Sequence, residues 1–518
     1  MKKTATKLFR VMGNMDYYAG RRDSPIYEEL SIELPDDPKK FLRIGLTHGA
    51  QIERRGDHTQ LEEIANEKNY NILISGHTHK EEIFKTSKGV LLLNPGSVTG
   101  AWSFIASRNC CFIVIQIEAD IRNITIDLYC LDKQTRVIKK SSKFYKFNGN
   151  FDKEEGSKLK LFTPGPVDVS EQVLQELSKP NDTHRSTSYE EMHESVIGGL
   201  KELLFTKNNC FIFTSSASGV MEACVRNLIK KDDKALFFSV GAFGDRWFEM
   251  GKGNGKNATK EGVKWGEVIT SEFAKEALSK DCYDVVFIQS NETSTGVYNP
   301  INEIVPIIKD TGALVCVDAT SSMAGVKVEV DTLGIDVCLA SVQKCFALPP
   351  GLAVASVSNK ALEKAKQVTN RGYYFDFLRV NNNNEKRQTL TTPPIPQIRA
   401  LAFQLDYILN KEGLEERFKR HTRLGKRTRI WARDMNLEMF SDDHFASNTV
   451  STIKNSFNIN LEKLISEMIK KGFRIANGYG KLKDKTFRIG HMGQITLRQL
   501  EDMLKTLSDT ITRIRLDL

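Results

Sequence analysis

Short apolar runs that end in polar residues recur along the chain and predict buried strands. Two of them lie close together in the sequence, at 313–318 and at 335–340. Runs of this length are typical of strands that are covered on both faces of a sheet. Open α/β sheets bind their ligands at the carboxyl ends of their strands. Asp318, which ends the first run, and Lys344, which follows the second, are therefore candidate functional residues.

The first 147 residues show a related pattern with shorter runs. Apolar segments at 41–47, 71–75 and 90–93 each end in a polar loop, while 112–118 and 124–129 alternate between apolar and polar residues. Alternation with a period of two is typical of a strand with one exposed face, so the last two segments predict an antiparallel pair. Both parts of the chain are expected to be α/β.

A polar, charged stretch at 148–157 separates the two patterns and predicts a solvated linker. At 518 residues the chain is longer than one ordinary domain. We predict an N-terminal domain over 1–147, a large domain over 158–395 and a smaller C-terminal domain over 396–518. Within the large domain, the asparagine run at 381–384 predicts a flexible loop.

Composition narrows the function classes. The formal net charge of +9 is spread along the chain without a basic block, so nucleic-acid binding is not expected. No stretch approaches the roughly 20 apolar residues that cross a bilayer. Nine cysteines without a regular spacing predict reduced thiols in an intracellular protein. The basic N-terminus lacks the apolar segment of a secretory signal, so we expect a cytoplasmic protein, with a mitochondrial presequence as the alternative.

Asp318 and Lys344 together suggest pyridoxal 5′-phosphate (PLP) as a cofactor. PLP needs a primary amine for covalent attachment and an acid partner that keeps its pyridine nitrogen protonated, so that the ring can act as an electron sink. Lys344 fits the first role and Asp318 the second. A lysine after a strand is more often merely solvated, so this interpretation depends on further motifs.

Such motifs run from about Lys158 to Leu518. They lie at 163–166, 215–218, 241–247, 292–296, Asp318, 343–344 and 487–490. Their order resembles that of class V, fold-type I, PLP-dependent aminotransferases of the alanine:glyoxylate and serine:pyruvate group. The resemblance implies a large α/β domain with a mainly parallel sheet, a smaller C-terminal α+β domain, and a homodimer with shared active sites.

The small residues at 215–219 form a predicted turn between a strand and a helix. Free backbone N–H groups and the helix dipole at such a helix N-terminus favour a phosphate group. Ser216, Ala217 and Ser218 are therefore the predicted phosphate-binding residues. The family usually has Gly-Ser-Gly-Thr here, so Ser215 and Ala217 replace glycines, which leaves the loop conformation open but not the anion site.

The resemblance also assigns roles to single residues. Phe243 stacks on the pyridine ring, Ser294 hydrogen-bonds that ring, and Gln343 contacts the phosphate or a substrate group. Thr392 reaches across the dimer interface to the partner subunit's phosphate. Arg488 ends a predicted strand, and its planar guanidinium suits bidentate binding of a substrate carboxylate. An ordinary core position for Phe243 and a structural salt bridge for Arg488 remain the alternatives.

Histidines follow the predicted strands of the N-terminal domain. His77 and His79, in a Gly-His-Thr-His turn, can face one point, and neutral imidazoles bind divalent first-row ions. With the motifs at 13–16, 48–49, 72–80 and 94–101, this segment resembles the second half of a calcineurin-like metallophosphoesterase, and most closely the small scaffold subunit of retromer, an endosomal sorting complex. The resemblance implies a vestigial set of metal ligands, Asn14, His48, His77 and His79.

The family's opening Asp-x-His and its next ligands are missing, since residues 1–12 contain neither Asp nor His. A two-metal hydrolytic site needs both ions to hold the attacking and leaving oxygens. We therefore expect an incomplete metal site and a non-catalytic interaction domain, with exposed sheet edges. Two other interpretations stay open. The missing portion comes from another chain or was lost from a truncated gene model, or the domain is an active phosphodiesterase.

As a whole, the sequence predicts a transaminase that acts between a small amino acid, alanine or serine, and a 2-oxo acid, glyoxylate or pyruvate. The choice of donor and acceptor cannot be read from the sequence. One alternative is an endosome-associated sorting scaffold, in which residues 1–147 bind a retromer-like partner and the PLP domain is passive. Cysteine desulfurase is another class V activity, but those enzymes have a histidine before the lysine, where this chain has Gln343.

Overall fold

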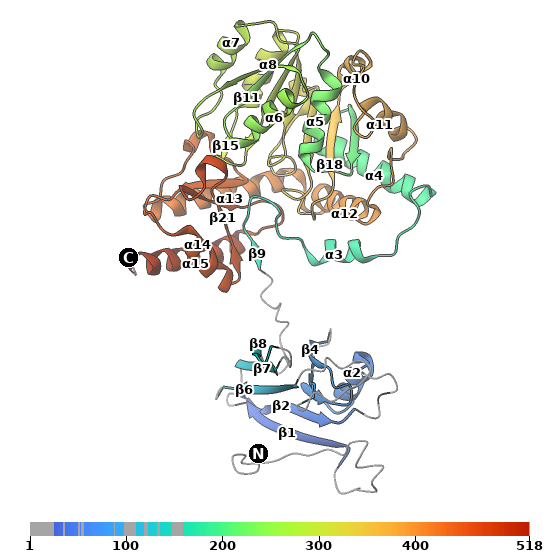
Figure 1. The fold of residues 1–518 in the computed structure, drawn as a ribbon, viewed down its shortest axis with the longest axis vertical. Helices are drawn as coiled ribbons and strands as arrows, with labels where there is room; N and C mark the ends of the chain where they lie inside the picture. The colour runs from blue at the N-terminus through green and yellow to red at the C-terminus, as the bar shows by residue number, and fades with distance from the viewer. Residues whose placement is uncertain are drawn as a thin grey trace. The chain divides into compact units, whose positions relative to one another are not determined.

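The structure is a computed structural model, and it describes residues 25–34, 37–49, 52, 56–86, 89–97, 110–118, 123–131, 135–147 and 159–516. The chain divides into two compact units, Met1–Lys158 and Leu159–Leu518, which are described separately (Figure 1). Asn14 and the predicted linker at 148–157 lie outside the described residues.

The C-terminal unit is built around a seven-stranded sheet. In spatial order its strands are β10 (Asn209–Phe213), β18 (Ala353–Val357), β17 (Val337–Ser341), β16 (Leu314–Asp318), β13 (Val285–Gln289), β11 (Lys234–Ser239) and β12 (Asn257–Gly262). Strand β18 is antiparallel to both of its neighbours, and the five strands from β17 to β12 run parallel. The strands predicted at 313–318 and 335–340 are confirmed as β16 and β17.

Side chains of this sheet alternate between two apolar cores. Phe237 and Phe287 face one core, while Phe238 and Ile288 face the other. The first core is covered by α5 (Ala217–Leu228), α6 (Ala242–Gly253), α10 (Asn359–Lys366) and α11 (Phe377–Asn384). The second is covered by α3 (Glu171–Ser178), α4 (Thr187–Leu203), α7 (Ser271–Ser279), α8 (Ile301–Asp310), α9 (Val330–Leu333) and α12 (Ile395–Asp406). Helices on both faces explain why β13, β16, β17 and β18 are buried at every position (Figure 1).

A smaller part of the unit packs helices on an antiparallel three-stranded sheet. The strands, in spatial order, are β19 (Val450–Lys454), β22 (Thr486–Gly490) and β21 (Ala476–Asn477), and the helices are α13 (Leu414–Asp434), α14 (Leu461–Lys470) and α15 (Leu497–Leu516). They share one core, which includes Phe487, Leu464 and Leu504. Beside it, β20 (Phe473–Arg474) pairs in parallel with β9 (Lys160–Leu161). The remaining short elements of the unit are β14 (Asn291–Glu292), β15 (Val297–Tyr298), η1 (Tyr407–Glu412), η2 (Asp443–Phe445) and η3 (Gly480–Leu482).

The prediction of a flexible loop at 381–384 is wrong, because these residues end helix α11. Asp376 caps that helix by accepting hydrogen bonds from the backbone N–H groups of Leu378 and Arg379. Phe377 and Val380 anchor the first turns in the core. Cap and anchors both precede the asparagines, so the composition of the run alone could not reveal the helix.

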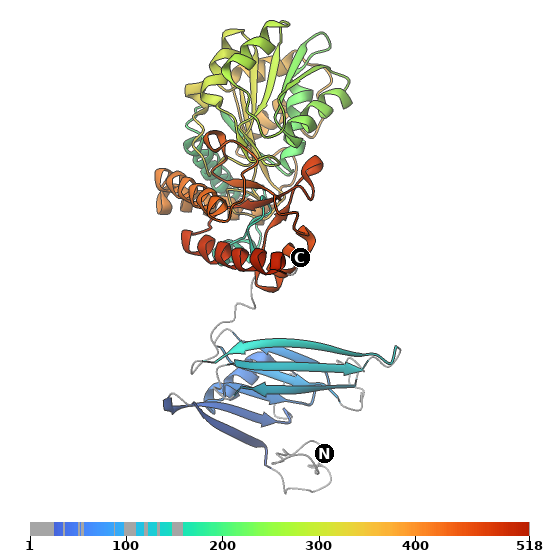
Figure 2. The ribbon, with the colours of Figure 1, turned by 90° about the vertical axis from the view of Figure 1, so that its left-hand side faces the viewer.

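The N-terminal unit is a sandwich of two sheets. The first contains, in spatial order, β1 (Tyr27–Leu34), β2 (Asp37–Thr47), β3 (Ile72–Ser75), β5 (Leu91–Pro95) and β4 (Glu81–Lys85), and the second contains β6 (Cys110–Ile117), β7 (Asn123–Leu131) and β8 (Ile138–Lys146). Figure 2 shows the sheets stacked face to face. Leu42, Ile72 and Ile126 belong to the core between them, while α2 (His58–Glu67) covers the opposite face of the first sheet. The predicted antiparallel pair is confirmed as β6 and β7.

Cys111 and Cys130 face each other across β6 and β7 and form a disulfide. The other cysteines are free, and five of the seven are buried. The expectation of reduced thiols is therefore wrong for this pair, because the register of two strands, which composition does not reveal, places the sulfurs together. Among the described residues, no helix combines the length and the apolar character needed to cross a membrane.

Candidate active site

Lys344 lies in a tight turn just beyond the end of β17. The backbone N–H of Ala347 donates to the Lys344 carbonyl at 2.8 Å, which closes the turn. Arg417, whose side chain is fully buried, donates to the Cys345 carbonyl and, at 2.6 Å, to the carbonyl of Ala324. The turn is therefore fixed both by its own hydrogen bonds and by a buried guanidinium beneath it.

The Lys344 side chain is 7 % exposed and held from two sides. Its Nζ donates to the Pro164 carbonyl at 2.6 Å and to Thr293 Oγ1 at 3.3 Å. The 163–166 segment passes so close that a Cβ on Gly165 would lie 2.9 Å from Lys344 Cγ, and the φ of Gly165 is +111°. A glycine is required there both by the backbone conformation and by the approach of the lysine.

Burial, together with the nearby charge of Arg488, lowers the pKa of Lys344 to about 8, while the charge of Asp318 opposes the change. An ordinary lysine is almost wholly protonated at neutral pH. With a pKa of about 8, a sizeable fraction of Lys344 is the uncharged amine, which is the form that attacks a carbonyl carbon.

Asp318 ends β16 and is 4 % exposed. Its Oδ1 accepts a hydrogen bond from the backbone N–H of Thr320 at 2.8 Å. Within the part of the chain that the structure describes, no backbone N–H donates to its Oδ2, so this oxygen can accept a hydrogen bond from a protonated nitrogen. Burial raises the pKa of Asp318, while the hydrogen bonds of Thr320 and the charges of Lys344 and Arg246 oppose the rise.

A cavity of about 440 Å³ opens beside Lys344. Phe243, Thr293 and Arg488 line it together with the 163–166 segment. The Phe243 ring stacks on Tyr479 with 5.5 Å between centroids, and Lys344 Nζ lies 5.9 Å from the Phe243 ring centre. Three residues predicted from separate motifs thus share one cavity.

Arg488 projects from β22 and is 9 % exposed. Its Nε donates to the Asn477 carbonyl at 3.0 Å and its Nη1 to the Thr293 carbonyl at 3.4 Å. Burial lowers its pKa to about 10. No carboxylate of the described residues pairs with it, so the structural salt bridge considered above is not what holds this side chain. Two backbone carbonyls orient the guanidinium, and the charge is left for a ligand.

Glu292 is a supporting residue that the sequence did not single out. This fully buried carboxylate accepts hydrogen bonds from the backbone N–H groups of Phe243 and Gly244 at 3.0 and 3.2 Å. It also accepts the Ser294 hydroxyl at 2.6 Å. Burial raises its pKa, and these hydrogen bonds oppose the rise. A Cβ on Gly241 would lie 2.4 Å from Glu292 Cγ, so the glycine makes room for the carboxylate. Glu292 thereby fixes the start of α6 and the Phe243 side chain.

Ser294, which the resemblance assigns to a hydrogen bond with the cofactor ring, already has partners within the protein. It is fully buried, its hydroxyl donates to Glu292, and it accepts the backbone N–H of Ala242 at 3.0 Å. Its neighbour Thr293 lines the cavity instead and reaches Lys344. Two adjacent hydroxyl residues have opposite orientations here, which the motif alone could not resolve.

The predicted phosphate site lies at the start of α5. Ser216 is the N-cap, but its side chain makes no capping hydrogen bond, so the helix's first N–H groups, those of Ala217 and Ser218, are left for another acceptor. Gln343 is half-buried, and its carbonyl accepts the backbone N–H of Val167. Thr392 is exposed. None of these five residues lines the cavity described above, and their roles stay predictions.

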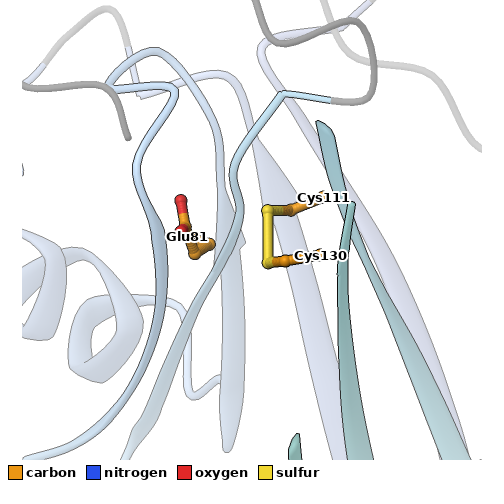
Figure 3. A group of neighbouring side chains, drawn as sticks. All are labelled: Glu81, Cys111 and Cys130. Atoms are coloured by element: carbon orange, nitrogen blue, oxygen red, sulfur yellow. A yellow bond between two sulfur atoms is a disulfide. The ribbon is translucent and has the colours of Figure 1, made fainter. Parts of the chain in front are cut away.

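In the N-terminal unit the predicted ligands converge only in part. The His48 and His77 rings lie 5.1 Å apart in an edge contact, and the buried Nδ1 of His79 has no hydrogen-bond partner among the residues that the structure describes. Among the described residues, the group whose ligand atoms lie close together is instead Glu81, Cys111 and Cys130 (Figure 3). Its two sulfurs form the disulfide and carry no thiolate charge, so it does not constitute a metal site.

The groups around Lys344 fit PLP. The lysine supplies a partly uncharged amine, Asp318 offers a buried carboxylate oxygen to a protonated ring nitrogen, and Phe243 offers an aromatic face. The uncapped start of α5 suits a phosphate.

Comparison with known proteins agrees with this geometry. Residues 166–466 match the family described as aminotransferase class-V, and residues 1–120 match the calcineurin-like phosphoesterase superfamily domain. An uncharacterized aminotransferase of Methanocaldococcus jannaschii is 39 % identical over 345 residues, which cover 66 % of this chain and 89 % of that protein. A serine–glyoxylate aminotransferase of Arabidopsis thaliana is 29 % identical over 353 residues, covering 66 % of this chain and 87 % of that protein.

A solved structure shares the fold of the C-terminal unit. The ureidoglycine–glyoxylate aminotransferase of Bacillus subtilis has a TM-score of 0.64 and 26 % identity, with 68 % of this chain and 92 % of that chain covered. The chain therefore belongs to the class V aminotransferase family: its C-terminal unit is a PLP-dependent transaminase, joined to an N-terminal calcineurin-like phosphoesterase domain.

Proposed function

We propose that the protein transfers the amino group of a small amino acid, alanine or serine, to a 2-oxo acid, glyoxylate or pyruvate. The observation that carries this proposal is that Lys344 and Arg488 line one cavity, the first with a pKa of about 8 and the second unpaired with any described carboxylate. One group suits the amine chemistry and the other suits the substrate carboxylate. The likeness to a serine–glyoxylate aminotransferase supports this choice of substrates.

The residues divide the work as follows. Bound PLP supplies an electron sink for the substrate's Cα, which no side chain of the protein can provide. Arg488 holds the substrate carboxylate, and Phe243 keeps the ring plane fixed. Lys344 Nζ takes the proton from Cα and returns it, a role for which a pKa close to neutral is favourable. Asp318 keeps the proton on the ring nitrogen.

The direct test replaces the lysine. Lys344→Ala should remove both the visible absorbance of lysine-linked PLP and transaminase activity with alanine and serine. Lys505→Ala, on the exposed side of α15, is the matched control and should retain both. An unchanged absorbance spectrum in Lys344→Ala would show that another group holds the cofactor.

We also propose a homodimer in which Thr392 binds the partner subunit's phosphate. Its exposure makes the side chain available to a second chain. Mixed dimers of Lys344→Ala and Thr392→Ala subunits test this arrangement. If Thr392 acts across the interface, one site in each mixed dimer has both native residues and regains native PLP affinity. If Thr392 acts within its own chain, neither site recovers.

For the N-terminal unit we propose a non-catalytic role in binding another protein. Seven large apolar side chains are exposed on its described residues, the same number as on the much larger C-terminal unit: Ile26, Leu30, Phe84, Phe112, Val137, Ile138 and Phe144. Exposed apolar side chains favour binding to a protein partner. We predict that this partner is a retromer-like sorting complex and that the protein is cytoplasmic, with a fraction associated with endosomes.

Two measurements test that role. Affinity capture with the full chain should recover sorting-complex subunits, and a variant with Phe112, Ile138 and Phe144 replaced by serine should lose them. Metal analysis of the purified protein should find fewer than two ions per chain and no phosphodiester hydrolysis. Two tightly held ions with turnover would instead assign this unit a phosphodiesterase activity.

A further inference from the structure

The active-site cavity holds more positive charge than an alanine or serine substrate needs. Of the described residues that line it, Lys344, Arg474 and Arg488 are cationic and none is acidic. Lys344 serves the cofactor and Arg488 suffices for the single carboxylate of alanine or serine. Arg474 therefore has no task in the proposed reaction with either amino acid.

The local backbone explains why both arginines reach the same cavity. Ala476 lies directly opposite Arg488 in the pairing of β21 with β22, and Arg474 precedes Ala476 by two residues. In an extended chain, residues two apart lie on one face and are separated by about 7 Å. Ile475, between them, is 1 % exposed and belongs to the apolar core. Arg474, Ala476 and Arg488 therefore share a face, and the small methyl group of Ala476 leaves space between the two guanidiniums.

The backbone of Arg474 is held while its side chain is not. Its carbonyl accepts the backbone N–H of Phe162 at 2.8 Å, and β20 pairs with β9, so the residue is fixed at the rim. The side chain is exposed, and no hydrogen bond or ion pair links it to any other residue that the structure describes. Arg488, by contrast, is buried at 9 % exposure. One guanidinium lies deep in the cavity and the other at its mouth.

The cations in this cavity repel one another, as the effect of Arg488 on the pKa of Lys344 shows. Arg246, just outside the lining, adds a further positive charge and donates to the hydroxyl of Tyr479 at 2.6 Å. A ligand with a single negative charge would compensate Arg488 only. A ligand with a second anionic group, one side-chain length from its α-carboxylate, would compensate both arginines.

We propose that Arg474 is a specificity-determining residue that binds a second anionic group on the substrate side chain. This inference rests on the proposed transaminase function and extends its substrate class from alanine and serine to amino acids with an acidic side chain. The anionic group is a carboxylate, as in aspartate or glutamate, or a phosphate, as in O-phosphoserine. Either one can accept the two parallel N–H donors of a guanidinium.

The kinetic test compares donors in the PLP-loaded full-length protein. Arg474→Gln should lower kcat/KM for the acidic donors by about 10- to 100-fold, as expected for loss of a charge-assisted hydrogen bond, mainly through KM. Its kcat/KM for alanine and serine should stay within twofold. Arg474→Lys keeps the positive charge but not the two parallel N–H donors, so its kcat/KM for the acidic donors should lie between those of the wild type and Arg474→Gln. Arg498→Gln, which removes an exposed arginine of α15 outside the cavity, is the matched control and should change nothing.

Comparing aspartate and glutamate with O-phosphoserine decides between carboxylate and phosphate. The anionic group that Arg474 recognises is the one carried by the amino-acid donor whose kcat/KM falls most in Arg474→Gln. An equal loss of kcat/KM for all donors, alanine included, would show that Arg474 binds the α-carboxylate and would overturn the proposal. No loss for any acidic donor would show a merely solvated arginine and would overturn it as well.

A binding measurement separates this inference from the proposed function. Isothermal titration of the PLP-loaded protein with succinate and with propionate reports recognition without turnover. Succinate should bind at least tenfold more tightly than propionate, and Arg474→Gln should remove the difference. Tighter binding of succinate would support the role of Arg474 in binding a second anionic group even if no amino acid were transaminated. Equal binding of the two acids would contradict that role even in an active transaminase.

Discussion

The two units of this chain place chemically active side chains in the same way but support them differently. In both, candidate residues follow the ends of strands: Asp318 and Lys344 in the C-terminal unit, His48 and His77 in the N-terminal unit. Five neighbouring parallel strands bring their carboxyl ends to one edge in the former. In the latter, β2, β3 and β5 alone run parallel among the described strands, with antiparallel strands on either side.

The supporting residues differ as well. Lys344 is oriented by Pro164 and Thr293, and its turn rests on the buried guanidinium of Arg417. Within the described part of the N-terminal unit, a buried ring nitrogen of His79 has no hydrogen-bond partner, and the histidines do not gather into a three-ligand group. In the C-terminal unit, the groups around the candidate residues thus fix their geometry, as a functional site requires.

The largest expected effect sharpens this contrast directly. Asp318→Asn should lower transaminase activity on the order of 10²- to 10³-fold, because an amide cannot hold the proton on the ring nitrogen as a carboxylate does. His79→Asn should leave that activity unchanged. Steady-state kinetics with alanine and with serine measures both variants, and a comparable loss in His79→Asn would show that the N-terminal unit takes part in the reaction.

The disulfide provides the next test, on stability rather than activity. Cys111 and Cys130 are 19 positions apart, and closing a loop of about that length stabilises a fold by about 3 kcal/mol. Reduction, or Cys111→Ala, should therefore lower the melting temperature of the N-terminal unit by about 10 °C or more. The melting transition of the C-terminal unit, followed by PLP absorbance, should not move. A shared shift would mean that the two units unfold together.

Glycine substitutions separate backbone strain from damage to the site. Gly165 and Gly312 both have a left-handed φ, of +111° and +84°, but a Cβ meets Lys344 at the first and open space at the second. Each change to alanine should cost about 1–2 kcal/mol of stability. Gly165→Ala alone should also lower PLP affinity, which absorbance titration measures. Equal PLP affinity in the two variants would show that the 163–166 segment does not constrain the lysine.

The smallest effect concerns pH. Since Lys344 has a pKa of about 8, attachment of PLP to the apo-protein should slow about tenfold for each pH unit below 8 and level off above it. The positive charge of Arg488 disfavours the protonated amine, so Arg488→Gln should raise the pKa of Lys344 and move this profile to higher pH. Stopped-flow absorbance follows the attachment. A profile that stays in place would show that burial alone sets the pKa.

Much of the fold and the core of the site could be predicted from the sequence. Asp318 and Lys344 follow mainly apolar runs, and such runs predict buried strands whose carboxyl ends meet. The α/β class, the class V aminotransferase family and the PLP cofactor are confirmed. The roles given to Ser216, Ala217, Ser218, Gln343 and Thr392 stay predictions, because they depend on a bound cofactor and a second chain.

What the sequence could not give was orientation and long-range pairing. Thr293 and Ser294 are adjacent and chemically alike, yet Glu292 draws one hydroxyl into the core and leaves the other at the cavity. Arg474 looks like a surface residue until β9 and β20 pair and place it at the cavity mouth. The disulfide likewise depends on a register between two strands.

The sequence by itself determined which segments become buried strands and where polar residues such as Asp318 end them, because local apolar patterning decides burial. The tertiary structure alone decided which side chains share the cavity, which charges stay unpaired and which hydroxyl faces the lysine. These outcomes depend on contacts between residues as far apart as Pro164 and Lys344. The energy of such contacts arises only when the packed chain brings them together and removes water from between them.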